Sequence, residues 1–185
     1  MRPSPLAVYA VLTGLLDPLA PALLRRRARQ GKEDLARLAE RLGRARSARP
    51  EGALVWLHGV SVGEATSLLP LIEALRGRRP DLALLVTSGT TTAAELLARR
   101  LPHGVIHQYA PIDTPQTVGR FLGHWRPALA IFVESELWPN LIQEANTRGV
   151  KLALVSARIT EKTSRSWRRF PVAAHEIFSS FDLIL

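Results

Sequence analysis

The chain has 185 residues, enough for one well-cored domain with a short appendage. Hydrophobic residues make up 46% of it and charged residues 22%, a balance that excludes an intrinsically disordered protein. Cysteine is absent, which excludes disulfide bridges and thiolate metal sites. The formal net charge is +9, and its location decides what it indicates.

The positive charge is concentrated in one segment, residues 25–49. Ten basic and three acidic side chains there account for +7 of the net charge of +9 and leave +2 for the other residues. A nucleic-acid-binding surface would carry its charge on the folded domain, interleaved with aromatic residues, so we expect no nucleic-acid partner. The basic residues of the segment are Arg25, Arg26, Arg27, Arg29, Lys32, Arg37, Arg41, Arg44, Arg46 and Arg49.

An apolar stretch, residues 5–24, comes directly before this basic segment and contains only Thr13 and Asp17 as polar residues. It just reaches the roughly 20 residues that a membrane span needs. Basic residues beside such a stretch mark the cytoplasmic side and attract anionic lipid. We therefore predict that residues 1–49 are a membrane anchor with a basic collar, spanning or partly inserted, and that residues 50–185 form the folded domain.

Two other interpretations of the N-terminal segment remain open. One is an amphipathic helix that lies on a surface. The other is a cleaved signal peptide, but such a peptide carries its charge before the apolar core and a small-residue cleavage site after it. Here only Arg2 precedes the apolar stretch and a block of arginines follows it, which favours a retained segment.

Short apolar runs alternate with helical patterns from residue 54 onward, and each run is bounded by turn-forming residues. Apolar strands that alternate with helices indicate a parallel sheet covered on both faces. We predict an α/β fold, a Rossmann-like domain. The runs begin at Leu54, Leu82, Val105, Ala128 and Lys151, and the helical patterns cover residues 64–76, 92–101, 116–125 and 137–148.

The last five residues, 181–185, read FDLIL and are typical of the opening of another strand. A natural domain rarely stops inside a buried strand, because the backbone and apolar side chains would lack partners. We therefore expect the chain to be a fragment of a longer protein or a truncated gene product.

The loop after the first predicted strand reads HGVSVGE. It contains the G-x-S-x-G pattern of a hydrolase nucleophile elbow around Ser61, for which His175 would have to be the partner. The loop also ends on Glu64 at a helix start, where a carboxylate serves either as a general base at the ligand edge or as a stabiliser of its helix. The residues themselves leave these alternatives open.

The later strand-end loops offer groups that bind sugars and phosphates. Residues 87–92 read TSGTTT, with hydroxyls and free backbone N–H groups at a helix start; the simpler interpretation is N-capping by Thr91 or Thr92. Residues 134–140 read ESELWPN and place two carboxylates two residues apart. Arg158 follows the fifth strand and suits a phosphate or carboxylate. No second cluster with metal-ligand spacing accompanies these acids, so we expect no metal.

The ordered strings HGVSVGE, LLVTSGTTTA, YAPIDTP, FVESELWPN and LVSARIT closely resemble the N-terminal domain of Kdo transferases, which handle 3-deoxy-D-manno-octulosonic acid (Kdo). The resemblance covers residues 54–185. It implies the N-terminal, acceptor-side half of a two-domain B-type glycosyltransferase fold, whose donor-binding domain is not part of this chain. A membrane-tethered binding module without catalysis is the remaining alternative.

The resemblance also implies an activity and a set of site residues. The family transfers Kdo from CMP-Kdo to the lipid A precursor (lipid IVA), in lipopolysaccharide biosynthesis at the cytoplasmic face of the cell inner membrane, without an obligatory metal or other cofactor. Glu64 matches the proposed general base. The fragment alone is expected to be inactive. The predicted substrate-binding residues are Ser61, Gly63, Thr87, Ser88, Thr90, Glu134, Glu136, Asn140 and Arg158.

Overall fold

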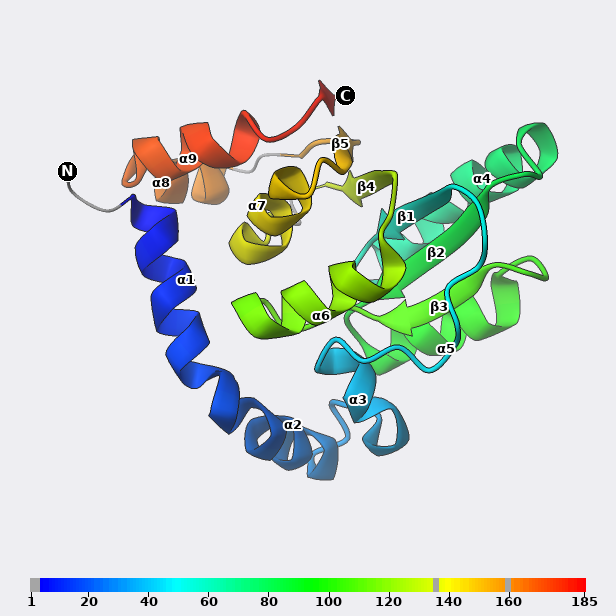
Figure 1. Ribbon diagram of the computed structural model, residues 1–185, viewed down its shortest axis with the longest axis horizontal. Coiled ribbons are helices and arrows are strands. Elements are labelled where there is room, and N and C mark those ends of the chain that lie inside the picture. The colour runs from blue at the N-terminus through cyan, green and yellow to red at the C-terminus, as the bar shows by residue number, and fades with distance from the viewer. Residues whose placement is uncertain (1–3, 135–136, 159–160) are drawn as a thin grey trace.

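A six-stranded parallel sheet forms the centre of the protein in its computed structural model, which describes residues 4–134, 137–158 and 161–185. The strand order is β3-β2-β1-β4-β5-β6 (Figure 1), and every neighbouring pair is parallel. This order confirms the predicted Rossmann-like α/β fold. The strands are β1 (Leu54–His58), β2 (Ala83–Ser88), β3 (Ile106–Tyr109), β4 (Leu129–Val133), β5 (Lys151–Val155) and β6 (Leu183–Ile184).

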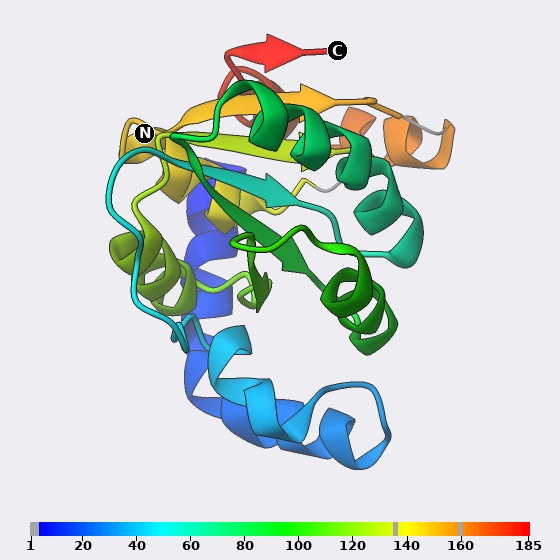
Figure 2. The same ribbon diagram turned by 90° about the vertical axis from the view of Figure 1, so that its right-hand side faces the viewer.

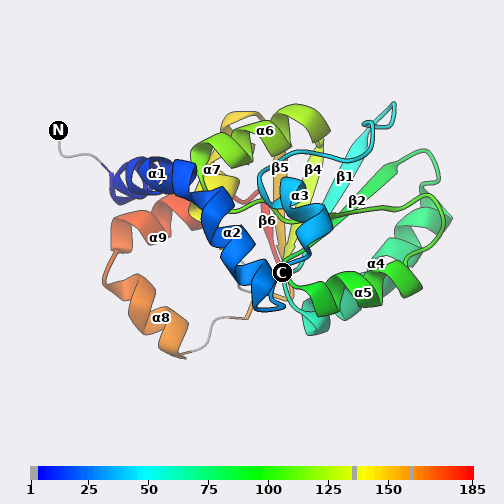
Figure 3. The same ribbon diagram turned by 90° about the horizontal axis from the view of Figure 1, so that it is seen from below.

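Helices cover both faces of the sheet, as Figure 2 and the view from below in Figure 3 show. Each strand therefore buries successive side chains on opposite faces, which explains the continuous apolar runs in the sequence. On β1, Trp56 packs into the cluster beneath one helix layer and Leu57 into the cluster beneath the other. One layer contains α4 (Val62–Arg78) and α5 (Thr91–Arg100); the other contains α6 (Pro115–Trp125), α7 (Pro139–Thr147) and α9 (Pro171–Phe178).

The predicted strand starts are confirmed to within one residue. The final run, 181–185, also forms a strand as predicted, because β6 pairs with β5. Two helices that the sequence patterns did not predict, α8 (Glu161–Arg168) and α9, lie between β5 and β6.

The N-terminal apolar stretch folds into α1 (Pro5–Leu16), a 3₁₀ turn η1 (Asp17–Leu19) and α2 (Ala20–Arg29). Among the described residues, 5–29 form one helical stretch that is long and apolar enough to cross a membrane. In the structure α1 packs alongside α6, α7 and α9 (Figure 3). The predicted anchor is thus in contact with the folded domain along one of its sides.

The basic segment is also attached to the domain. It forms η2 (Leu35–Arg37) and α3 (Leu38–Arg41) and then runs against α6. The Arg49 guanidinium donates to the carbonyl of Trp125 at 2.8 Å, and Arg120 of α6 donates to the carbonyl of Leu42 at 2.9 Å. The boundary predicted between residues 49 and 50 stays a prediction.

Candidate functional site at the carboxyl edge of the sheet

The sheet has its topological switch point between β1 and β4. The chain leaves β1 for α4 on one face and leaves β4 for α7 on the other. In open α/β sheets the crevice outside the carboxyl ends of such strands is where ligands bind. The loops after β1 and β4, which contain Glu64 and Glu134, therefore flank the expected ligand crevice.

Glu64 lies in the first turn of α4 and is buried, with 8% of its surface exposed. Its Oε2 accepts from the Val60 backbone N–H at 2.6 Å, and its Oε1 accepts from the Ser61 hydroxyl at 2.8 Å. Ser61 is the N-cap, and its Oγ accepts from the Glu64 backbone N–H at 3.3 Å. The pair differs from a standard capping box, because the Glu64 carboxylate accepts from the N–H of Val60, the residue before the N-cap, rather than from the N–H of Ser61. A carboxylate held rigidly at a strand end is also a well-placed base.

The geometry does not support the serine hydrolase. A nucleophile elbow places its serine in a sharp, strained turn, whereas Ser61 is extended at φ −94° and ψ 170°. Its hydroxyl donates a hydrogen bond to Glu64 Oε1. Within the described residues the hydrogen bonds of Ser61 involve Glu64 and no histidine.

The second loop departs from the prediction in detail. Thr87 and Ser88 are completely buried, and their hydroxyls are bound to neighbouring strands rather than facing the crevice. Thr90, not Thr91 or Thr92, is the N-cap of α5, and its Oγ1 accepts from the Ala93 backbone N–H at 3.2 Å. The helix begins one residue earlier than the pattern suggested, because Thr91 already has helical geometry.

Thr87 links two aromatic rings of β1. Its Oγ1 accepts from the Trp56 indole N–H at 2.8 Å and lies 2.8 Å from His58 Nδ1. The indole can only donate, but the hydroxyl can accept twice, so the direction of the hydrogen bond between Thr87 and His58 Nδ1 depends on the imidazole tautomer. Burial, and after it the positive charge of Arg41, lowers the pKa of His58 to about 3. The neutral ring lines the cavity described below, and its Nε2 is buried without a hydrogen-bond partner among the described residues.

The third and fourth predicted regions are brought to the same edge. Glu134 follows β4 and Ser156 follows β5, and both adopt left-handed backbone angles, with φ of +59° and +52°. Such angles cost a residue other than glycine roughly 1–3 kcal/mol and cluster at functional sites. Arg158 is exposed beyond β5, and Gly63 is exposed in the first turn of α4. Glu136, the second predicted acid, lies outside the described residues.

Asn140 is turned away from the crevice. Its side-chain amide donates to the Asp113 carbonyl at 2.6 Å and to Thr13 Oγ1 of α1 at 2.9 Å. Asp113 in turn accepts from the backbone N–H of Leu141 at 2.9 Å, so it caps α7. The structure thus gives Asn140 contacts with the N-terminal helix, and its predicted role in substrate binding stays a prediction.

A cavity of about 520 Å³ lies between α2 and the carboxyl ends of β1 and β2. Its walls are mostly apolar and come from the N-terminal helices, the loops after the first three strands, and the start of α7. Val60, whose N–H binds Glu64, belongs to the lining. The cavity therefore connects the apolar N-terminal segment with the loop that contains the predicted base. Other lining residues are Leu16, Leu23, Arg41, His58, Thr90 and Trp138.

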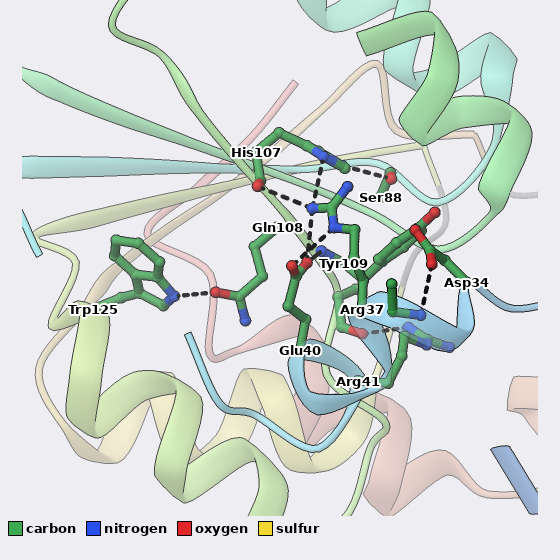
Figure 4. Close-up of polar contacts among 11 residues, drawn as sticks. Asp34, Arg37, Glu40, Arg41, Ser88, His107, Gln108, Tyr109 and Trp125 are labelled. Atoms are coloured by element: carbon green, nitrogen blue, oxygen red, sulfur yellow. Dashed lines mark hydrogen bonds and ion pairs between the residues drawn. The ribbon is translucent and has the colours of Figure 1, made fainter. Parts of the chain in front are cut away.

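Sequence reasoning missed a polar cluster beside this edge (Figure 4). Arg37 donates from Nε and Nη2 to the two carboxylate oxygens of Glu40 at 2.8 and 2.7 Å, and its guanidinium stacks 4.5 Å from the Tyr109 ring centre. Glu40 also accepts from the Tyr109 backbone N–H at 2.8 Å. Arg37 further lies 3.2 Å from His107 Nδ1, and Ser88 Oγ lies 2.9 Å from His107 Nε2. Two basic residues of the collar, Arg37 and Arg41, thus bind β3 and the loop after it.

This cluster predicts a loss of stability in acid. Burial, followed by the charge of Arg37, lowers the pKa of His107 to about 4, whereas in the unfolded chain it is near 6.5. Between these values the unfolded state binds the extra proton, so stability is lost as the pH falls from 6.5 towards 4, by about 3 kcal/mol in total. Urea unfolding at pH 7 and pH 4.5 measures this loss.

Two variants isolate the histidine's contribution. His107→Gln removes the titrating ring. We expect the difference in the free energy of unfolding between pH 7 and pH 4.5 to become smaller by the contribution of His107. His103→Gln, at an exposed histidine, is the matched control and should leave the pH dependence unchanged. Equal slopes in both variants would contradict the assignment.

No group of three or more histidine, aspartate or glutamate side chains with metal-binding geometry occurs in the described parts of the chain. The expectation that no metal takes part stays a prediction. The fold defines a Rossmann-like α/β domain, a class that binds its ligands at the carboxyl edge of its sheet, and polar loops follow the strands at that edge here.

Comparison with known proteins identifies the family. The model of the 3-deoxy-D-manno-octulosonic-acid transferase (kdotransferase) family matches residues 36–185. The chain is 41% identical over 160 residues to a mitochondrial protein of Arabidopsis thaliana named as a probable 3-deoxy-D-manno-octulosonic acid transferase, covering 86% of this chain and 36% of that protein. The chain belongs to the Kdo transferase family.

Bacterial relatives agree with this assignment. The 3-deoxy-D-manno-octulosonic acid transferase of Rickettsia bellii is 38% identical over 162 residues, which cover 88% of this chain and 38% of the relative. The transferase of Bordetella pertussis is 35% identical over 185 residues, covering 96% of this chain and 43% of the relative. The chain thus spans less than half the length of these relatives.

Proposed function

We propose that this chain is the acceptor-side half of a glycosyltransferase that moves Kdo from CMP-Kdo to a hydroxyl of the lipid A precursor, lipid IVA. The observation that carries the proposal is the family match over residues 36–185, which includes every strand-end loop of the candidate site. The basic, apolar N-terminal segment suits an acceptor that bears phosphates and resides in a bilayer. The site of action is the cytoplasmic face of the cell inner membrane.

Glu64 is the proposed general base. In the free enzyme its Oε1 accepts a hydrogen bond from the Ser61 hydroxyl, and its Oε2 accepts one from the Val60 backbone N–H. An acceptor hydroxyl that replaces Ser61 at Oε1 gives its proton to Glu64, and the oxygen attacks the anomeric carbon of Kdo. The bond from that carbon to the CMP phosphate oxygen breaks, and CMP leaves with the electron pair. The carboxylate needs no rearrangement of its helix for this step, because Oε2 keeps its backbone partner.

The other predicted residues position the two substrates. Glu134 and Glu136 accept hydrogen bonds from sugar hydroxyls, and Arg158 suits the charge of a phosphate or carboxylate. The start of α5, with Thr90 as its N-cap, offers backbone N–H groups to an anion. CMP-Kdo is held mainly by a second, donor-binding domain, so this chain by itself is expected to be inert.

The proposal is tested with a chimera in which the carboxyl-terminal part of the Bordetella pertussis relative follows this chain. Transfer of radiolabelled Kdo from CMP-Kdo to lipid IVA is measured for the chimera and for the chain alone. We expect transfer by the chimera only. Full transfer by the chain alone would overturn the two-domain account. A folded chimera that binds CMP and lipid IVA without transferring Kdo would favour the binding module.

A further inference from the structure

The inner side of the N-terminal helix is attached to the domain by buried polar groups. The Tyr9 hydroxyl donates to Asp113 Oδ2 at 3.0 Å, and the Asn140 amide donates to Thr13 Oγ1 at 2.9 Å. These bonds join α1 to the loop after β3 and to α7. Apolar contacts accompany them, because Leu6 is buried in the same cluster as residues of α6, α7 and α9. Polar contacts of this kind require a fixed position of α1 on the domain.

Asp17, the one acid of the apolar stretch, is buried and bound to the domain as well, with 8% of its surface exposed. Its Oδ1 accepts from the hydroxyls of Thr114 and Thr117, the latter at 3.1 Å. Its Oδ2 lies 3.5 Å from Arg120 Nη2. A spanning helix would have to carry this carboxylate into hydrocarbon. Here the carboxylate is bound by Thr117 and Arg120 of α6 and by Thr114, the residue before α6.

The outer side of the same helices is apolar and uncovered within the described residues. Seven large apolar side chains are between 43% and 72% exposed there, and their spacing of three or four residues places them along one side of a helix. We call these residues the apolar stripe. Its members are Val8, Val11, Leu12, Leu15, Leu16, Leu19 and Leu23. Leu16 and Leu23 also line the 520 Å³ cavity, so the stripe reaches the edge of that cavity.

Exposed arginines follow the stripe on α2. Arg25, Arg26 and Arg29 lie beyond its last residue and are exposed. An apolar helix side with adjacent cationic side chains is complementary to a leaflet that contains anionic lipids. A protein partner would need no such cluster of positive charge next to the apolar contact.

A spanning orientation conflicts with the inner contacts. If α1 crossed the hydrocarbon core in its observed position, α6, α7 and α9 would enter the core with it. These helices carry exposed or partly exposed charged side chains, including Arg120, Glu144 and Arg148, and charged groups at that depth are strongly disfavoured. Otherwise α1 would have to detach and leave Asp17 and Asp113 without their partners. The helical stretch is also interrupted at η1, where Pro18 follows Asp17.

We infer that α1–α2 lies in the plane of the membrane interface, with the apolar stripe in one leaflet and the opposite side fixed on the domain, and does not span the bilayer. The N-terminus and the domain then lie on the same side of the membrane. The inference rests on the membrane association in the proposed function, but it does not depend on the transfer chemistry. It also places the 520 Å³ cavity, which α2 helps to line, beside the leaflet.

Single-cysteine labelling tests this topology, because the chain contains no cysteine of its own. Ser4→Cys reports the N-terminus, and Gly77→Cys, on α4 where an added side chain meets nothing within 4 Å, reports the domain. Inverted inner-membrane vesicles containing the full chain are treated with a membrane-impermeant maleimide, with and without detergent. We expect both cysteines to react without detergent. Labelling of Gly77→Cys with at least tenfold protection of Ser4→Cys until detergent is added would establish a spanning helix and overturn the inference.

A second measurement tests whether lipid covers the apolar stripe. Leu15, the most exposed residue of the stripe at 72%, is changed to glutamate, and Gly77→Glu supplies the same charge on α4. Binding is measured by sedimentation with vesicles of phosphatidylethanolamine and phosphatidylglycerol. We expect Leu15→Glu to weaken binding at least tenfold and Gly77→Glu to leave it nearly unchanged, with thermal unfolding unchanged in both.

Different results distinguish a failure of this inference from a failure of the proposed transfer function. If the unmodified chain forms a dimer that ignores vesicles and Leu15→Glu makes it monomeric, the stripe is a protein interface and the inference is wrong. If the chain binds vesicles with both cysteines accessible while the chimera transfers no Kdo, the in-plane helix stands and the proposed transfer function fails.

Discussion

Replacing Glu64 by glutamine is expected to lower Kdo transfer by the chimera about 10²–10⁴-fold, the usual cost of removing a general base. Glutamine has nearly the same shape, and its amide oxygen still accepts from the Val60 N–H, which the carboxylate binds at 2.6 Å. The variant therefore keeps most of the capping geometry while it loses the ability to take a proton. Initial rates at saturating lipid IVA, together with acceptor binding, measure the effect.

Ser61→Ala is the matched control for this prediction. It removes the N-cap hydroxyl that accepts from the Glu64 N–H and donates to Oε1, a loss that costs about 0.5–2 kcal/mol of stability, but it leaves the carboxylate in place. If Glu64 only caps α4, both variants will lose stability and neither will lose much activity. That result would move the search for the base to Glu134 and Glu136.

Gly43→Ala is expected to cost about 2–5 kcal/mol of stability, from backbone strain and overpacking together. Gly43 has a φ of +77°, and a β-carbon there would lie 2.1 Å from the Thr117 carbonyl oxygen of α6. The segment after α3 would have to move away from α6, although the hydrogen bond from Arg120 to the Leu42 carbonyl depends on this approach. Urea unfolding monitored by tryptophan fluorescence measures the loss.

Gly31→Ala separates backbone strain from the steric clash. Gly31 has a similar φ of +72°, but a β-carbon there meets nothing within 4 Å. It should cost only the strain, about 1–2 kcal/mol. If the two variants lose equal stability, the close approach of Gly43 to α6 does not contribute, and the basic segment is attached less firmly than the structure indicates.

The alternation of strands and helices was predictable from the sequence because it depends on local periodicity. A strand buried on both faces needs a short run of apolar residues, and LVWLH at 54–58 and LALLV at 82–86 have that form. The same reasoning placed Glu64 at a helix start and Glu134 at a strand end. Both positions depend on neighbours within a few residues, so no long-range information was needed. The start of a helix could be predicted only to within a residue or two. At α5, for example, Thr90, Thr91 and Thr92 can all cap a helix, and the sequence does not show which of them does so.

The orientation of side chains was not predictable in the same way. Thr87 and Asn140 belong to sequence stretches that were predicted to be ligand loops. In the structure Thr87 lies in β2 and binds Trp56, 31 residues away, and Asn140 lies in α7 and binds Thr13, 127 residues away. The cluster of Arg37, Glu40 and His107 also joins distant segments. Such contacts satisfy buried polar groups, and their partners are chosen by packing between segments rather than by spacing along the chain.

The sequence by itself determined the α/β class, the alternation of strands and helices from residue 54 to residue 155, the strand-end loops and the apolar, basic N-terminal segment. Only the tertiary structure decided which side of that segment is covered: α1 and η1 turn Tyr9, Thr13 and Asp17 towards the domain and leave the apolar stripe exposed. An apolar helix of this length has the same composition whether it spans, docks or lies on a membrane. The covered side is selected by partners such as Asp113 and Thr117, because the free energy of a polar group depends on what the fold places next to it.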